Sequence, residues 1–184
     1  MAKTNIYDFS SYLGGAARPN QFRVHINFPS ELVSNGSEAK RAATFLTHSA
    51  RLPSYTTEDT PIYYRGRVFH EAGEPTFQPW QCTIYNSADF LVRDAVEQWA
   101  NAINDPSVVY GITRPETYKG TVFVEQLDRE GNTLRVYKLV GAWPSETGEI
   151  ELGFQTNNEA ETFSVTFTYD YFVKGGAELL ETAS

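Results

Sequence analysis

The sequence predicts a mainly β domain, an antiparallel β-barrel or sandwich with one flanking α-helix. Six or more short segments alternate apolar and polar residues with the period of two that is typical of half-buried strands. One mid-sequence segment has the spacing of an amphipathic helix, and strands and helices do not alternate along the chain. With 184 residues, 41% of them hydrophobic, the chain can bury a core as a single domain.

The first predicted strand covers residues 22–28 and ends at Pro29, because the proline ring fixes φ and removes a backbone donor. Residues 30–40 centre on an Asn-Gly pair and are predicted to form a turn or loop insertion. Residues 42–49 are predicted to be a second strand. On the first strand, apolar side chains alternate with the polar Arg23, His25 and Asn27.

Residues 51–79 are rich in proline and glycine and are predicted to form a long excursion outside the central sheet, holding a short hairpin around Gly66. A strand is expected at 77–85. A helix is expected at 87–104, capped by Ser87 and ended by Asp105-Pro106. Its apolar stripe has helical spacing and consists of Val92, Val96, Trp99 and Ile103.

The second half predicts two strands at 119–127 and 133–141, joined by a hairpin loop in which Gly131 supplies a left-handed residue. A weaker strand is expected at 149–154. The last strand is the most regular, with Phe163, Val165, Phe167, Tyr169 and Tyr171 on one face. Residues from 174 onward are expected to be a tail.

Charge and composition exclude several classes of protein. The formal net charge is −8, and residues 93–184 hold 15 acidic against 7 basic residues, so sequence-specific nucleic-acid binding is not expected. One cysteine, Cys82, allows neither an internal disulfide nor a cysteine-based zinc cluster. No run of 18 apolar residues is present, so membrane insertion is not expected.

No catalytic pattern stands out, and the sequence predicts neither an enzyme nor a cofactor. The histidines His25, His48 and His70 are scattered and have no metal-ligand spacing. The pairs Glu149/Glu151 and Glu159/Glu161 have strand spacing, but a glycosidase needs two carboxylates in different environments across a cleft. A solvated acidic face is the better interpretation, and a carbohydrate-processing enzyme is the weaker alternative.

A series of short motifs in a fixed order resembles the tail tube proteins of contractile-tailed bacteriophages. The series starts with Arg18-Pro19-Asn20-Gln21-Phe22 and Leu52-Pro53. It continues through Gly73, Thr76-Phe77, Trp80, Tyr85-Asn86, Asp89-Phe90, Trp99 and Gly141-Ala142-Trp143-Pro144. It ends with Asn158-Glu159, Glu161-Thr162-Phe163 and Tyr169-Asp170-Tyr171. The resemblance covers about residues 17–172. No single motif is specific, but their order and spacing together are.

This resemblance implies a structural virion protein, assembled in the host cytoplasm, that forms rings of six by joining β-sheets between subunits. It divides the chain into an N-terminal arm (1–16), a tube β-barrel domain (17–172) and a C-terminal tail (173–184). Stacked rings would form the tail tube, the conduit for DNA ejection. The implied partners are the sheath protein outside, the tape-measure protein and transiently DNA inside, and baseplate and terminator proteins at the ends.

Two polar strand faces are candidates for lining the channel, because each lies opposite an apolar core face and small hydroxyls with net negative charge would not hold DNA. They are Arg23, His25 and Asn27, and Thr162, Ser164, Thr166, Thr168 and Asp170.

The excursion is the candidate for contacts between rings, through Tyr63, Tyr64, Arg65, Gly66, Arg67 and Val68. The alternative is a loop that only covers its own barrel. At the level of function, the alternatives are a tube initiator at the baseplate and a tube protein of a type VI secretion system.

Overall fold

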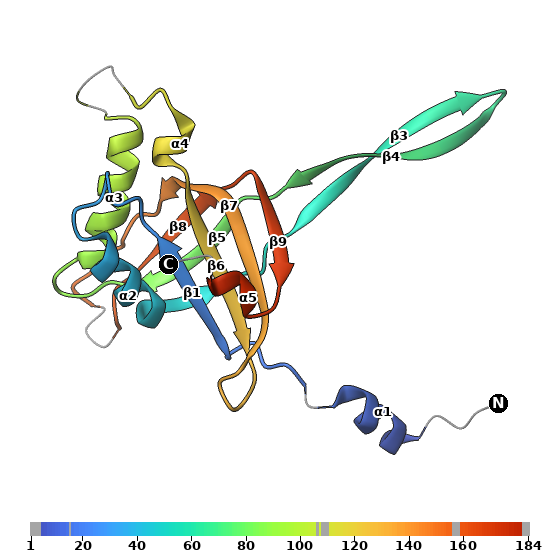
Figure 1. Cartoon of the computed structure of the whole chain (residues 1–184), viewed down its shortest axis with the longest axis horizontal. Coiled ribbons are helices and arrows are strands. Elements are labelled where there is room, and N and C mark those ends of the chain that lie inside the picture. The colour runs from blue at the N-terminus through green and yellow to red at the C-terminus, as the bar shows by residue number, and fades with distance from the viewer. Residues whose placement is uncertain (1–4, 15, 106, 108–110, 156–158, 182–184) are drawn as a thin grey trace.

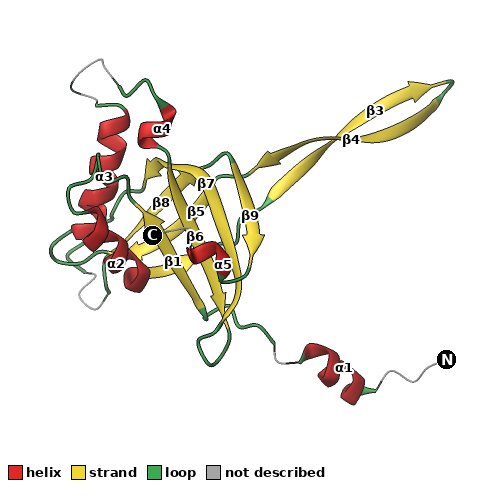
Figure 2. Cartoon of the chain, viewed as in Figure 1, coloured by secondary structure: helices red, strands yellow, loops and turns green. Residues whose placement is uncertain are grey.

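The structure is a computed structural model that describes residues 5–14, 16–105, 107, 111–155 and 159–181. It confirms the mainly β, antiparallel fold (Figures 1 and 2). The strands are β1 (Phe22–Asn27), β2 (Thr47–Ala50), β3 (Tyr55–Tyr64), β4 (Arg67–Phe77), β5 (Trp80–Tyr85), β6 (Gly120–Leu127), β7 (Thr133–Thr147), β8 (Thr162–Thr168) and β9 (Tyr171–Gly175). The helices are α1 (Ile6–Leu13), α2 (Gly36–Leu46), α3 (Leu91–Ile103), α4 (Pro115–Tyr118) and α5 (Glu178–Glu181).

The body is one strongly bent sheet with the strand order β1-β6-β7-β8-β5-β2, to which β9 is added beside β7. The 15-residue β7 belongs to both walls, because its first part pairs with β6 and β9 and its last part pairs with β8. The core lies between the walls. One wall contributes Val24, Val122 and Leu139, and the other contributes Ile84, Val165 and Phe167.

Burial alternates along the strands as the sequence predicts. In β5 and in β8 every second residue is buried, because successive side chains point to opposite faces. The predicted last strand is broken, however, at Tyr169-Asp170, after which the chain continues as β9 along β7. Tyr171 therefore does not share the buried face of Phe163 and is exposed.

The prediction of a strand at 42–49 was wrong for residues 42–46, and the prediction of a loop at 30–40 was wrong from Gly36 onward, because helix α2 occupies residues 36–46. Ala39 and Ala43, one helical turn apart, are fully buried against the core. Asn35-Gly36 is the start of the helix and not a turn between strands, since the Asn35 carbonyl accepts the backbone N–H of Ala39. Only β2, from Thr47, remains of the predicted strand.

Helix α3 has the predicted apolar stripe but a later start. Val92, Val96 and Trp99 are buried as expected, whereas the helix begins at Leu91 after Phe90, which has a left-handed φ of +53°. Ser87 does not cap it, because its hydroxyl donates to Asp89 within the preceding turn. The predicted stop at Pro106 lies outside the described residues.

One further prediction needs correction. Residues 149–154 form no strand, although Glu149 to Phe154 has alternating apolar residues. The arm and tail contain the short helices α1 and α5, and α1 buries none of its side chains.

The excursion forms a long hairpin, β3–β4, which is a two-stranded sheet of its own and projects from the body (Figure 1). Its position outside the central sheet agrees with the prediction, but it is much longer than the short hairpin expected. Aromatic rings fix its base: Phe77 lies 5.7 Å from Phe172 and 6.0 Å from Tyr169, measured between ring centroids. The hairpin is thus held at one end only.

Candidate functional site

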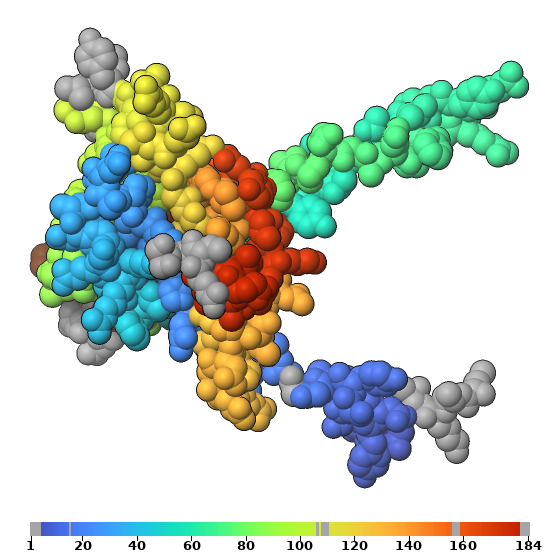
Figure 3. All heavy atoms as spheres, in the orientation of Figure 1, coloured from blue at the N-terminus to red at the C-terminus, as the bar shows by residue number. Residues whose placement is uncertain are grey.

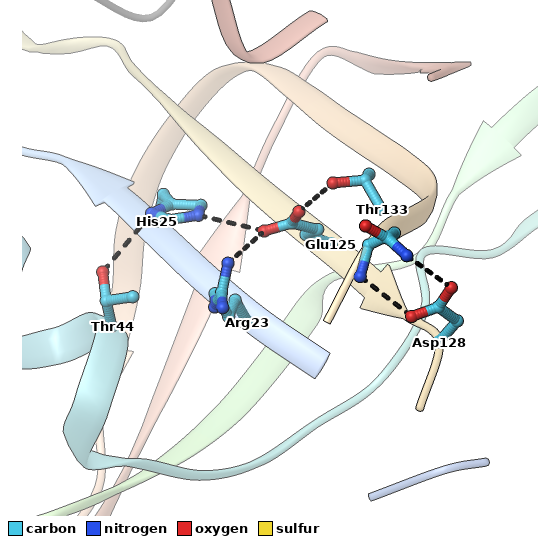
Figure 4. A network of polar contacts seen from close by, with 7 residues as sticks. Arg23, His25, Thr44, Glu125, Asp128 and Thr133 are labelled. Carbon is cyan, nitrogen blue, oxygen red and sulfur yellow. Dashed lines mark hydrogen bonds and ion pairs between the residues drawn. The ribbon is translucent and has the colours of Figure 1, made fainter. Parts of the chain in front are cut away.

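The polar face of β1 is held by a buried carboxylate on β6 (Figure 4). Glu125 is only 2% exposed, and its carboxylate lies 3.9 Å from the Arg23 guanidinium and 3.4 Å from His25 Nε2. Thr133 donates its hydroxyl to the other Glu125 oxygen, and His25 Nδ1 lies 3.4 Å from the Thr44 hydroxyl on α2. These contacts tie β1, β6, β7 and α2 together.

Glu125 was missed at the sequence level, although the alternation of β6 places it beside Arg23 on the neighbouring strand. The sequence does not show that β1 pairs with β6, and only this pairing brings Glu125 next to Arg23. On the same face of β1, the Asn27 side-chain oxygen is buried and has no hydrogen-bond partner among the described residues.

The polar face of β8 carries small hydroxyl groups. Thr162, Ser164, Thr166 and Thr168 are partly exposed and alternate with the buried residues of the strand. Their neighbours on β5 are also uncharged: Gln81 pairs with Thr166 and Thr83 with Ser164. Ser145 donates to the Thr166 carbonyl, and the Thr166 hydroxyl lies 3.4 Å from the Glu146 carboxylate, to which it donates.

The two predicted channel faces do not form one surface. β1 and β8 lie on different walls of the bent sheet, separated by β6 and β7, and both walls direct their apolar residues into the shared core. Their polar faces therefore point away from each other. Asp170 lies on neither strand, and both of its carboxylate oxygens accept hydrogen bonds from Lys119.

The structure does bring the six predicted contact residues together at the tip of the β3–β4 hairpin (Figure 3). Tyr64 pairs with Arg67, and the two residues between them, Arg65 and Gly66, have φ values of +47° and +80°. This two-residue turn with positive φ at both positions matches the twist of the strands. The Arg65 guanidinium lies over the Tyr64 ring, 5.3 Å from its centroid.

The glutamate pairs Glu149/Glu151 and Glu159/Glu161, which have strand spacing in the sequence, lie on one part of the surface but not on a strand. Glu151, Glu159 and Glu161 line an open cleft of about 680 Å³ together with apolar residues, and Glu149 lies next to it in the chain. Asn86 donates its side-chain amide to Glu161 over 2.5 Å. Among the residues that line the cleft there is no histidine, cysteine or basic side chain.

The three histidines lie far from a common centre. His25 contacts Glu125, His70 Nδ1 lies 2.6 Å from an Asp59 oxygen, and His48 packs against the Tyr85 ring. No group of three metal-ligating side chains occurs within the part of the chain that the structure describes.

Complete burial raises the pKa of Cys82 to about 12. None of the described helices has the length and apolar character needed to cross a membrane.

Comparisons with known proteins agree on one family. The family model for phage tail tube proteins matches residues 17–174. The tail tube proteins gp19 of Enterobacteria phages T6 and T4 are each 30% identical to the chain over 161 residues, which is 86% of this chain and 92% of theirs. The tail tube protein of Serratia phage KSP90 is 26% identical over 156 residues, or 85% of this chain and 87% of that one.

Solved structures share the fold at low sequence identity. A chain of the sixfold-symmetrised baseplate of the anti-feeding prophage superposes with a TM-score of 0.60 at 12% identity, covering 88% of this chain and 97% of that one. A chain of the sheath-tube complex of an extracellular contractile injection system superposes at 0.55 and 13%, covering 95% of this chain and all of that one. With the family match over residues 17–174, these comparisons place the protein in the phage tail tube protein family.

Proposed function

We propose that this protein is the tube subunit of a contractile phage tail, which closes into rings of six and stacks them into the conduit for DNA ejection. The observation that carries the proposal is the family match over residues 17–174, the segment that folds as the bent sheet with its hairpin. The role is structural, and the protein belongs to the virion tail after assembly in the host cytoplasm.

Ring closure requires free strand edges, because unpaired backbone groups accept a strand from another chain. Among the described strands of the bent sheet, β1 pairs only with β6, β2 only with β5 and β9 only with β7, so each has one free edge. The outer edges of these three strands are our candidates for joining sheets between subunits.

The β8 face is the better candidate for the channel wall. Its outward residues, and those of the adjacent β5, are hydroxyls, an amide and a tyrosine without any cation. Few condensed counterions would be released from passing DNA, so the polyanion would not be held. The β1 face carries Arg23 and His25, both engaged with Glu125, and is the alternative wall.

The hairpin tip is the candidate contact between successive rings, because it stands clear of its own body and exposes aromatic residues. Deleting residues 63–68 is expected to leave rings but prevent long tubes. Unchanged tube length would contradict this role and favour a loop that serves only its own subunit.

We expect partner proteins on the outside of the tube, in its channel and at its two ends. The exposed side of α3 is our candidate for contact with sheath protein, and the tape-measure protein and transiently DNA would occupy the channel. Among the structural neighbours are chains from a baseplate, a sheath/tube terminator and a tube cap. We infer that comparable proteins bind the two ends of this tube.

Negative-stain microscopy of the purified protein tests the proposal. Stacked rings or filaments with a central channel are expected. Single rings that do not stack would instead indicate a tube initiator, and a monomer with glycoside turnover would indicate an enzyme at the glutamate cleft. Single cysteines at Thr166 and at Arg23 test the wall: in tubes, the one that faces the channel is expected to lose access to a bulky thiol reagent.

A further inference from the structure

The tip of the β3–β4 hairpin has no partner within its own subunit among the described residues. Tyr63, Tyr64 and Phe69 are exposed by 77, 66 and 65%. A two-stranded hairpin alone is marginally stable in water. Because nine residues of β3 (56–64) and ten of β4 (67–76) extend beyond the aromatic base at Tyr55 and Phe77, the tip stands roughly 30 Å from it. A surface of this kind is typical of a contact site.

The tip has a distinct chemistry. Between Pro61 and Phe69 the only charged residues are Arg65 and Arg67, which flank the turn. The two arginines lie beside the exposed aromatic rings, and the Arg65 guanidinium lies over the Tyr64 ring. A complementary surface would be apolar with carboxylates at its rim, because arginine binds carboxylates with two parallel hydrogen bonds.

The cleft at residues 150–154 and 159–162 has this complementary chemistry. Leu152 is 82% exposed and Phe154 is fully exposed, so apolar side chains that a monomer would bury are open to solvent here. Residues 149–155 and 159–161 contain four glutamates and no basic residue. The hydrogen bond from Asn86 to Glu161 holds one side of the cleft in place.

The cleft and the tip lie on opposite sides of the molecule. The segment that forms the cleft follows Gly148, whose carbonyl accepts a hydrogen bond from Arg93 on α3, and the hairpin leaves the body on the side away from α3 (Figure 1). The hairpin therefore cannot reach the cleft of its own subunit. A tip on one side and its complement on the other generate a head-to-tail contact that repeats from copy to copy.

We propose that the hairpin tip of one copy docks in the cleft lined by residues 150–154 and 159–162 of a second copy, with Arg65 and Arg67 paired to the cleft glutamates and the aromatic rings against Leu152 and Phe154. This contact rests on the proposed tube function and names the acceptor for the hairpin. Helix α1 also exposes apolar residues, but Ile6–Leu13 carries one acid and no base, so it does not complement an acidic cleft.

Charge reversal with rescue tests the contact. The variants R65E/R67E and E151R/E159R each place like charges across the interface, and the mean tube length is expected to fall at least about tenfold in each. The variant that combines all four substitutions restores opposite charges and is expected to recover long tubes. The pair R129E/R135E, which reverses two exposed arginines on the β6–β7 hairpin, is the matched control and is expected to keep full-length tubes.

Cysteine cross-linking locates the contact directly. Val68→Cys chains are mixed with Leu152→Cys chains that carry an extension, so that the two differ in size on a gel, and the mixture is oxidised. A disulfide between the two kinds of chain is expected. The control pair, Val68→Cys with Leu134→Cys, is expected to form none. If wild-type chains form tubes but the charge reversals leave their length unchanged and no mixed disulfide appears, the contact is wrong and the tube function stands. Wild-type chains that form no rings overturn both.

Discussion

Lys119 and Asp170 form an ion pair at the corner where β8 ends and β9 begins, with the ammonium 2.7 and 2.8 Å from the two carboxylate oxygens. The carboxylate also lies against Gly141 of β7, where φ is +68°. A Cβ atom at this glycine would come within 2.2 Å of an Asp170 oxygen. The corner is therefore compatible only with a glycine at position 141 while Asp170 is paired with Lys119.

Gly141→Ala should destabilise the fold by about 2 to 4 kcal/mol, because the left-handed backbone and the collision with Asp170 both oppose a side chain. Gly131→Ala is the matched control, since Gly131 has φ +86° but no atom within 4 Å of its Cβ position. It should lose only about 1 kcal/mol. Urea denaturation measures both, and equal losses would contradict the role of Asp170.

Trp99→Phe should lower the free energy of unfolding by about 1 to 3 kcal/mol. Trp99 is fully buried between the Phe28 and Phe167 rings, and its indole N–H donates to the Tyr118 carbonyl over 2.7 Å. The phenyl ring leaves both a cavity and an unpaired carbonyl. Thermal and chemical unfolding give the measurement, and a stability equal to that of the wild type would refute the packing described.

Glu125→Ala should cost about 1 to 3 kcal/mol, because Thr133 and His25 lose a buried partner. Arg23→Ala, which removes the half-exposed member of the same group, should cost about 0 to 1 kcal/mol. Unfolding in urea compares the two variants. A larger loss for Arg23→Ala would show that the carboxylate does not organise this face.

We expect the free energy of unfolding to depend on pH through Asp128 in the β6–β7 loop. Hydrogen bonds from the Asn132 side chain and backbone hold the pKa of Asp128 below its usual value. A carboxyl with a lowered folded pKa contributes stability that is present above its unfolded pKa and lost as the pH falls through the folded one. The stability difference between wild type and Asp128→Asn should therefore shrink as the pH falls through the unfolded pKa of about 3.9 and below it. A difference that grows toward acid would contradict the assignment.

Cys82 should resist thiol reagents in the folded protein. Its side chain is buried within β5, and burial raises the pKa to about 12, so almost no thiolate forms near neutral pH. Labelling at about pH 8 should proceed only after denaturant is added. Rapid labelling of the native protein would show that the β5 wall opens.

Period-two alternation was enough to find β1, β5, β6 and β8, because each strand has one face on the core. It failed where local composition was ambiguous. Ala39 and Ala43 are small residues whose helical spacing is weak as a signal, and Asn35-Gly36 fits a turn as well as a helix start. Residues 149–154 alternate like a strand but have no neighbouring strand to pair with.

The candidate surfaces were predictable only in part. The tip residues of the hairpin follow from the two arginines around Gly66 and the Pro-rich flanks, and their adjacency is local. The separation of the β1 and β8 faces depends on strand order, which no residue pattern on one strand reveals. The link between Glu125 and Arg23, 102 positions apart, likewise required the register of β1 against β6.

The shared strand β7 has a mechanical consequence. Fifteen residues of continuous backbone serve both walls, so a force applied to one wall passes to the other through covalent bonds and strand ladders, without crossing a flexible connection. A tube built from such subunits is therefore expected to resist radial compression, because neither wall can bend without the other.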